Sequence, residues 1–202
     1  MEKKELEILA QAVLDRVFVP LEASGRHVHV TKDQAMALFG HGLTPERPLS
    51  QPGQFLSRER VTVVGPKGEF RNVAVLGPER KEAQVEVSLT DGKTLGIEPP
   101  VRLSGQVQDS PGCSLAGPNG QVRLDRGVIA ARRHIHLTPQ AAARFGVADK
   151  QVVSLRTFTT RPTVYGDVVV RISPDFAPAV HLDYDEANAC GFRNGDFGRI
   201  LP

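Results

Sequence analysis

Tryptophan is absent from this chain of 202 residues, and aromatic residues make up only 5% of it. So few aromatic rings argue against a platform that stacks the bases of single-stranded nucleic acid. Charge of one sign is not in excess either, because 25 basic residues stand against 23 acidic ones. This balance predicts no nucleic-acid partner, although it would tolerate an anionic small molecule. No apolar run approaches about 18 residues, so neither a membrane-spanning helix nor a membrane partner is predicted.

Cysteine is scarce as well, with only Cys113 and Cys190 in the chain. The two form neither a metal-binding CxxC pair nor a dense disulfide framework. The N-terminus has no continuous apolar core of the kind found in signal peptides. We therefore expect a protein of the reducing cytoplasm, and a buried or loop position explains each cysteine better than a role as acyl carrier.

Glycine and proline, by contrast, are frequent, with 19 and 15 residues. They separate many short apolar runs, and many short strands with such turns predict a mainly β fold, a barrel or a sandwich. A single strand is expected over 128–137, and short helices over 32–39, after Thr138 and near 186–190. Apolar residues at spacings of three and four predict an amphipathic helix over 3–17, packed on the body of the protein or bound to a partner.

An internal repeat stands out among these elements. The first copy, 26–31, reads Arg-His-Val-His-Val-Thr, and the second, 133–138, reads Arg-His-Ile-His-Leu-Thr. In each copy a Gln-Ala pair and a Phe-Gly pair follow in the same order. The repeat predicts two similar modules, each with a strand that leads into a capped helix, built around related sites.

The paired histidines of the repeat predict metal binding. Residues i and i+2 of a strand share a face, so His27 and His29 project together, as do His134 and His136. Two imidazoles on one side of a strand can chelate a divalent metal ion. For a lone pair, two surface or hydrogen-bonded histidines would be an equal alternative, but the duplication favours a metal.

Two further residues complete the candidate ligands. His181 alternates with apolar neighbours over 179–183, as a histidine on one face of a strand would. Glu86 lies on the polar face of another alternating segment, 84–88, although an ordinary solvent-facing glutamate has the same pattern. The remaining histidine, His41, is in a loop flanked by glycine, where a solvated side chain is expected.

The ordered set of these motifs resembles the PduL-type phosphate acyltransferases, also called phosphate propanoyltransferases or phosphotransacylases. The resemblance covers about residues 19–202, and its matching segments are 24–29, 63–68, 72–80, 84–88, 95–97, 100–105, 133–136 and 181–189. It implies two small β-barrels capped by short helices, with two zinc ions in the cleft between them. The implied boundaries are an N-terminal helix over 1–18, a first barrel from 19–25 with 132–202, and a second barrel from 26–131.

The resemblance also implies an activity, the reversible transfer of an acyl group between acyl phosphate and coenzyme A. The zinc ligands it implies are His27, His29 and Glu86 at one site and His134, His136 and His181 at the other. Arg80 matches the phosphate-binding arginine and is the expected catalytic residue. Coenzyme A contacts match Ser24, Leu76 and Asn188. Thiolate at the first zinc would attack the acyl carbonyl and phosphate would leave, so no side-chain nucleophile is needed.

Several points stay open at this stage. Gly25 and Ala74 stand where the family often has Asn and Arg, which leaves their contacts to coenzyme A open. A cupin-like metal enzyme and a non-catalytic zinc-binding module are the alternatives, although no Glu follows His29 or His136 at the spacing that cupins use. Neither the choice between propanoyl and acetyl groups nor a homodimer is fixed by the sequence. The same holds for residence in a bacterial microcompartment, with partners in its shell or core, and for a targeting role of the N-terminal helix.

Overall fold

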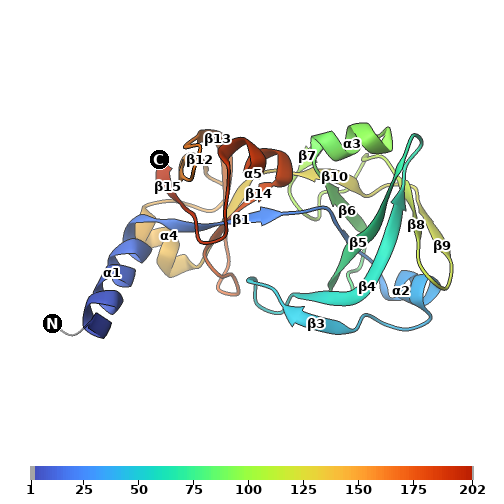
Figure 1. Cartoon of the computed structure of the whole chain (residues 1–202), viewed down its shortest axis with the longest axis horizontal. Coiled ribbons are helices and arrows are strands. Elements are labelled where there is room, and N and C mark those ends of the chain that lie inside the picture. The colour runs from blue at the N-terminus through green and yellow to red at the C-terminus, as the bar shows by residue number, and fades with distance from the viewer. Residues whose placement is uncertain (1–2, 202) are drawn as a thin grey trace. The chain divides into compact units, whose positions relative to one another are not determined.

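A computed structural model describes residues 3–201 and divides the chain into two compact units. Unit 1 comprises 1–23, 133–182 and 186–202, and unit 2 comprises 24–132 and 183–185. Strands dominate both units and the helices are short, which confirms the predicted mainly β fold class (Figure 1). None of the helices within the described residues is long and apolar enough to cross a membrane.

Unit 1 is built around a closed barrel of six strands in the order β1-β14-β11-β13-β12-β15. The barrel closes where β1 pairs antiparallel with β15, and apolar side chains such as Ile135, Leu155 and Val180 fill its core. Its elements are α1 (Lys3–Val17), β1 (Val19–Ser24), β11 (His134–Leu137), α4 (Pro139–Phe145), β12 (Val152–Phe158), β13 (Val164–Ile172), β14 (Ala179–Asp183), α5 (Tyr184–Cys190) and β15 (Phe197–Leu201).

Unit 2 contains a curled sheet of nine strands that follows the path β7-β10-β6-β2-β5-β4-β8-β9, with β3 paired to β4. Its own core includes Val28, Leu38, Val85 and Leu115. Its elements are β2 (His27–His29), α2 (Lys32–Phe39), β3 (Pro45–Pro48), β4 (Phe55–Val64), β5 (Glu69–Gly77), β6 (Gln84–Val87), α3 (Leu89–Leu95), β7 (Val101–Arg102), β8 (Cys113–Ala116), β9 (Gln121–Leu124) and β10 (Val128–Ala131).

The helices of the repeat begin and end where the sequence predicts. The Thr31 side chain accepts a hydrogen bond from the backbone N–H of Gln34, whose own side chain bonds back to Thr31, so α2 starts with a capping box. Helix α4 starts with Thr138 as N-cap and a proline in its first turn. Both helices end at a glycine with positive φ, Gly40 at 78° and Gly146 at 66°, a conformation that glycine adopts without steric cost.

The expected single strand over 128–137 is wrong, because the chain forms two strands there. Strand β10 pairs with β6 and β7 in unit 2, whereas β11 pairs with β13 and β14 in unit 1. The boundary between the units falls between Arg132 and Arg133, so the two parts of this apolar run belong to different units. An apolar run predicts that a segment is buried, but it does not predict which sheet the segment joins.

Other elements escaped the sequence prediction. Helix α3 was not expected, since its seven residues include Gly92 and two β-branched threonines, but a capping box between Ser88 and Asp91 starts it. Strand β3 carries two prolines and is exposed at the sheet edge, where a missing N–H donor is tolerated. Strand β8 is a further short addition.

The predicted N-terminal helix is present as α1. Its apolar side chains within the described set, Leu6, Val13, Leu14 and Val17, are all exposed, so they do not show the packing expected for this helix. Ile8, Leu9 and Ala10 belong to the same helix, but their side chains lie outside the described part of the chain.

Candidate active site

Strand alternation places the first histidine pair on the face of β2 away from the core. Val28 and Val30 are fully buried in the core of unit 2, so the side chains of His27 and His29 project from the other face. Glu86 stands directly opposite His27, because β2 and β6 pair antiparallel in that register. The ligand atoms of His27, His29 and Glu86 lie within 4.8 Å of one another, and all three residues are buried. We call this group the first triad.

Backbone carbonyls orient both imidazoles of the first triad. His27 Nδ1 lies 2.8 Å from the carbonyl oxygen of Gly25, and His29 Nδ1 lies 3.2 Å from that of Leu76. A carbonyl can only accept a hydrogen bond, so each Nδ1 carries a proton, and in the neutral ring each Nε2 keeps its lone pair. Metal-binding histidines commonly donate their other N–H to a carbonyl in this way. The first triad thus has the orientation that a metal ion requires.

The electrostatics of the first triad favour the same use. Burial lowers the pKa of His29 to about 2, and the nearby His27 and Arg80 add to the effect. Burial also acts to lower the pKa of His27, but the Glu86 carboxylate 3.5 Å away outweighs it, so this pKa is raised. A cation is therefore attracted to the side of His27 that faces Glu86, and His29 offers a neutral imidazole to it.

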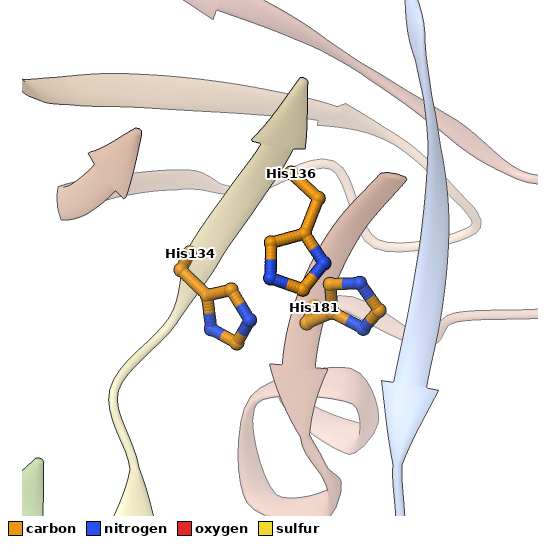
Figure 2. A group of neighbouring side chains, drawn as sticks. All are labelled: His134, His136 and His181. Carbon is orange, nitrogen blue, oxygen red and sulfur yellow. The ribbon is translucent and has the colours of Figure 1, made fainter. Parts of the chain in front are cut away.

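The second triad consists of His134, His136 and His181 and lies on the barrel of unit 1. Figure 2 shows the three rings gathered on neighbouring strands, and their centroids are 4.7 to 4.9 Å apart. Burial, together with the other two histidines and Arg171, lowers the pKa of His136 to about 2. Nδ1 of His136 is buried and has no hydrogen-bond partner among the described residues. Three imidazoles packed this closely form a donor set that fits a metal ion.

The two triads occupy equivalent places in the two units, as the sequence repeat predicts. His134 pairs in antiparallel register with His181, as His27 does with Glu86. The strand on the other side of each histidine pair, β5 or β13, runs parallel to it. The third ligand is therefore at the same register position in both units, but it is a carboxylate in one and an imidazole in the other.

The arginine that precedes each histidine pair is also equivalent in the two units. Arg26 donates two hydrogen bonds to Asp91 on α3, at 2.7 and 3.1 Å, and its guanidinium lies over the ring of Phe70. Arg133 pairs with Glu186 on α5 at 2.9 Å and lies over a tyrosine ring. Arg26 thus links the start of β2 to α3, the helix after the strand of Glu86. Arg133 likewise links the start of β11 to α5, the helix after the strand of His181.

Arg80, the expected catalytic residue, lies beside the first triad and acts on the charge of His29. Its Nη1 donates a hydrogen bond to Ser104 Oγ at 3.1 Å, and Gln84 Nε2 donates to the same oxygen at 2.8 Å. Gln84 Nε2 also donates to Oε1 of Glu86 at 2.5 Å. These contacts form a polar network from Arg80 to the carboxylate of the triad.

The three residues predicted to contact coenzyme A lie in different parts of the structure. Leu76 is on β5, and its carbonyl accepts the hydrogen bond from His29. Ser24 ends β1, three residues before His27, and is half-buried. Asn188 is exposed on α5 in unit 1. The contacts of these three residues to coenzyme A stay a prediction.

Neither the cysteines nor the remaining histidine joins a triad. Cys113 and Cys190 are both buried, and burial raises the pKa of Cys113 to about 12, which opposes a nucleophilic role. His41 is exposed and bonds to the carbonyl of Gly42.

Some residues near the triads were not found by sequence reasoning. Around the second triad, Glu22 Oε2 lies 3.6 Å from His181 Nδ1, and the ring of Phe176 stacks on His136 at 4.0 Å. Around the first triad, Gln84 and Ser104 were missed. Gln84 could have been found, because it shares the polar face of its strand with Glu86.

Comparison with known proteins identifies the family of this chain. The family model for phosphate propanoyltransferase matches residues 20–193. A phosphate propanoyltransferase of Enterococcus faecalis is 54% identical over 183 residues, which cover 90% of this chain and 87% of the relative. One of Listeria monocytogenes is 50% identical over 197 residues, 96% and 92% of the two chains, and one of Clostridioides difficile is 46% identical over 202 residues, 97% of each. The chain therefore belongs to the phosphate propanoyltransferase family and is an acyltransferase.

Proposed function

We propose that this chain transfers a short acyl group, propanoyl or acetyl, reversibly between acyl phosphate and coenzyme A, with one zinc ion held by each triad. The observation that carries the proposal is the pair of triads on equivalent strands, buried except for the partly buried His181, in a member of a family named for this transfer. The first triad offers two oriented imidazoles and a carboxylate, and the second offers three imidazoles. Zinc takes such nitrogen and oxygen ligands, and catalytic sites commonly use three protein ligands with one position left for substrate.

Zinc, when bound, would supply Lewis acidity and lower the pKa of a thiol, which removes the need for a side-chain nucleophile. The protein's own contribution is to hold the donors in place. The carbonyls of Gly25 and Leu76 fix which ring nitrogen of each histidine faces the first triad. Gln84 holds one oxygen of Glu86, which keeps the carboxylate in a single orientation.

Arg80 is the residue of this chain that we assign to phosphate. Its planar guanidinium can donate two parallel hydrogen bonds to phosphate oxygens, and it stays charged at all working pH values. The hydrogen bond to Ser104 holds the side chain beside the first triad. A cation at this place would bind the phosphate of acyl phosphate and stabilise the charge that develops as phosphate leaves.

The test is a thioester assay with purified protein, coenzyme A and a series of acyl phosphates, together with elemental analysis. We expect thioester formation with propanoyl or acetyl phosphate and close to two zinc equivalents per chain. The ratio of kcat/KM between acyl phosphates measures the chain preference, since one methylene changes it by about 10- to 200-fold. Full activity in protein stripped of metal would contradict the zinc proposal, and the absence of acyl transfer would contradict the function itself.

A further inference from the structure

A carboxylate lies beside the second triad, on the next strand of the barrel. Leu21 of β1 is in the core of unit 1, so the following residue, Glu22, is on the outer face of that strand. Val180 of β14 is in the same core, so His181 is also on the outer face. Strands β1 and β14 are neighbours in the barrel, and Figure 2 shows β1, in blue, on the side of His181. Glu22 Oε2 lies 3.6 Å from Nδ1 of His181.

This carboxylate faces one nitrogen of the His181 ring and leaves the other for a metal ion. A carboxylate only accepts hydrogen bonds, so in the neutral ring it favours the proton on Nδ1 and the lone pair on Nε2. Nε2 is buried. The ligand atoms that lie within 4.8 Å of one another come from the three histidines, and within residues 3–201 Glu22 does not belong to this group. Glu22 therefore lies behind a ligand and is not a ligand itself.

The two triads differ in the charge that their own side chains supply. Glu86 gives the first triad one negative charge, whereas the second triad consists of imidazoles only. Three neutral imidazoles would leave the full charge of a divalent ion uncompensated, and Glu22 is the carboxylate placed to offset part of it. In unit 2 the strand beyond Glu86 is β10, and the residue opposite Glu86 there is the apolar Ile129. Each unit thus has one carboxylate in this row of side chains, at a different position.

We infer that Glu22 is a positioning residue of the second triad, whose carboxylate accepts the Nδ1 proton of His181 and offsets part of the charge of a divalent metal ion bound there. The inference rests on the proposed function, which assigns zinc to this triad. A carboxylate behind a ligating histidine fixes the orientation of the ring and raises the basicity of the ligating nitrogen. The present separation of 3.6 Å is longer than a hydrogen bond. A bound cation makes Nδ1–H a stronger donor, so we expect the half-buried side chain of Glu22 to close this distance in the metal-loaded protein.

The experiment measures zinc affinity, not activity, in Glu22→Ala and Glu22→Gln. Each purified protein is titrated with zinc in competition with a chromophoric chelator. Glu22→Ala should lower the zinc affinity of the second triad by roughly 10- to 100-fold and leave that of the first triad unchanged. Glu22→Gln should lie between Glu22→Ala and the wild type, because its amide oxygen still accepts the Nδ1 proton but carries no charge.

Nitrogen-15 NMR of the imidazoles in the zinc-loaded protein identifies which triad is affected. In the wild type and in Glu22→Gln, Nδ1 of His181 should carry a proton protected from exchange with water, and Nε2 should have the chemical shift of a metal-bound nitrogen. In Glu22→Ala this proton should exchange faster, because it has lost its acceptor. The signals of His27 and His29 should stay unchanged in every variant, since backbone carbonyls orient these rings.

Glu69→Gln is the matched control, because Glu69 is an exposed carboxylate of unit 2 that pairs with Arg71. It should keep both zinc affinities. A Glu22→Ala protein with wild-type zinc affinity and an equally protected Nδ1 proton would overturn the inference. Equal losses of affinity at both triads would overturn it as well, because Glu22 would then support the fold and not the second triad.

Failure of the proposed function gives a different result. In that case the second triad of the wild-type protein would bind no zinc in the same titration, which would contradict the zinc proposal and this inference together. A wild type that binds two zinc ions, beside a Glu22→Ala protein that binds them equally well, would contradict the role of Glu22 alone.

Discussion

Glu86→Gln removes the negative charge of the first triad and keeps the size of the side chain. Gln84 Nε2 donates to Oε1 of Glu86 and needs an acceptor at that place. The same Oε1 lies 3.5 Å from His27 Nε2, so the new amide would place its neutral carbonyl oxygen there and its NH₂ group at the position of Oε2. A neutral amide would then replace the anionic ligand that we assign to the metal.

The magnitude follows from the role of the lost group. Removal of a residue that only supports a metal ligand commonly costs 10- to 100-fold in metal affinity, and Glu86 is proposed as a ligand itself. We expect zinc affinity at the first triad to fall at least about 100-fold, or about 2.7 kcal/mol. Since the carboxylate raises the pKa of His27, this pKa should fall in metal-free Glu86→Gln protein.

Chelator competition with elemental analysis measures the first effect, and NMR titration of the imidazoles measures the second. The variant should keep about one zinc per chain after a chelator challenge that leaves two in the wild type. Glu82→Gln is the control, because Glu82 is an exposed carboxylate paired with Arg126. A Glu86→Gln protein that retains two zinc ions and full activity would refute the assignment of Glu86 as a ligand.

Further variants test other parts of the structure. Arg80→Ala should lower kcat/KM at least about 100-fold with unchanged zinc content, and Arg80→Lys should recover little because an ammonium lacks the planar fork; steady-state kinetics and elemental analysis decide. His181→Ala should lose zinc from the second triad alone, whereas His41→Ala should match the wild type in both zinc content and activity. Asp91→Ala removes a capping contact of α3 and both hydrogen bonds from Arg26, so denaturant unfolding should show a loss of about 1–3 kcal/mol.

The parts of the fold that follow from local rules could be predicted from the sequence. The caps of α2 and α4 depend on residues within a few positions of each helix end, and both are where the sequence predicts them. The shared face of His27 and His29 follows from the period of a single strand. The break at Arg132 could not be predicted, because the pairing partners of β10 and β11 lie in different units and leave no local signal.

The third ligand of each triad is also hard to predict, because its position depends on pairing between strands that are distant in the sequence. Local alternation allows Glu86 to be either a ligand or a solvent-facing glutamate, and only the antiparallel register with His27 brings it to the first triad. The position of Ser104 is harder still to predict from the sequence, because it depends on a turn after β7 and on the orientation of the amide of Gln84. Sequence reasoning reached Glu86 through family resemblance and did not reach Ser104.

The duplicated triads differ in the side chains that surround them. Gln84 pairs with His29 in unit 2, and the residue that pairs with His136 in unit 1 is Ala179, whose side chain makes no hydrogen bond. The network of Gln84, Ser104 and Arg80 therefore has no equivalent at this register position of unit 1. A duplication preserved for metal ligands alone would need no such asymmetry. We therefore expect substitutions in the network to change phosphate kinetics without loss of metal from the second triad.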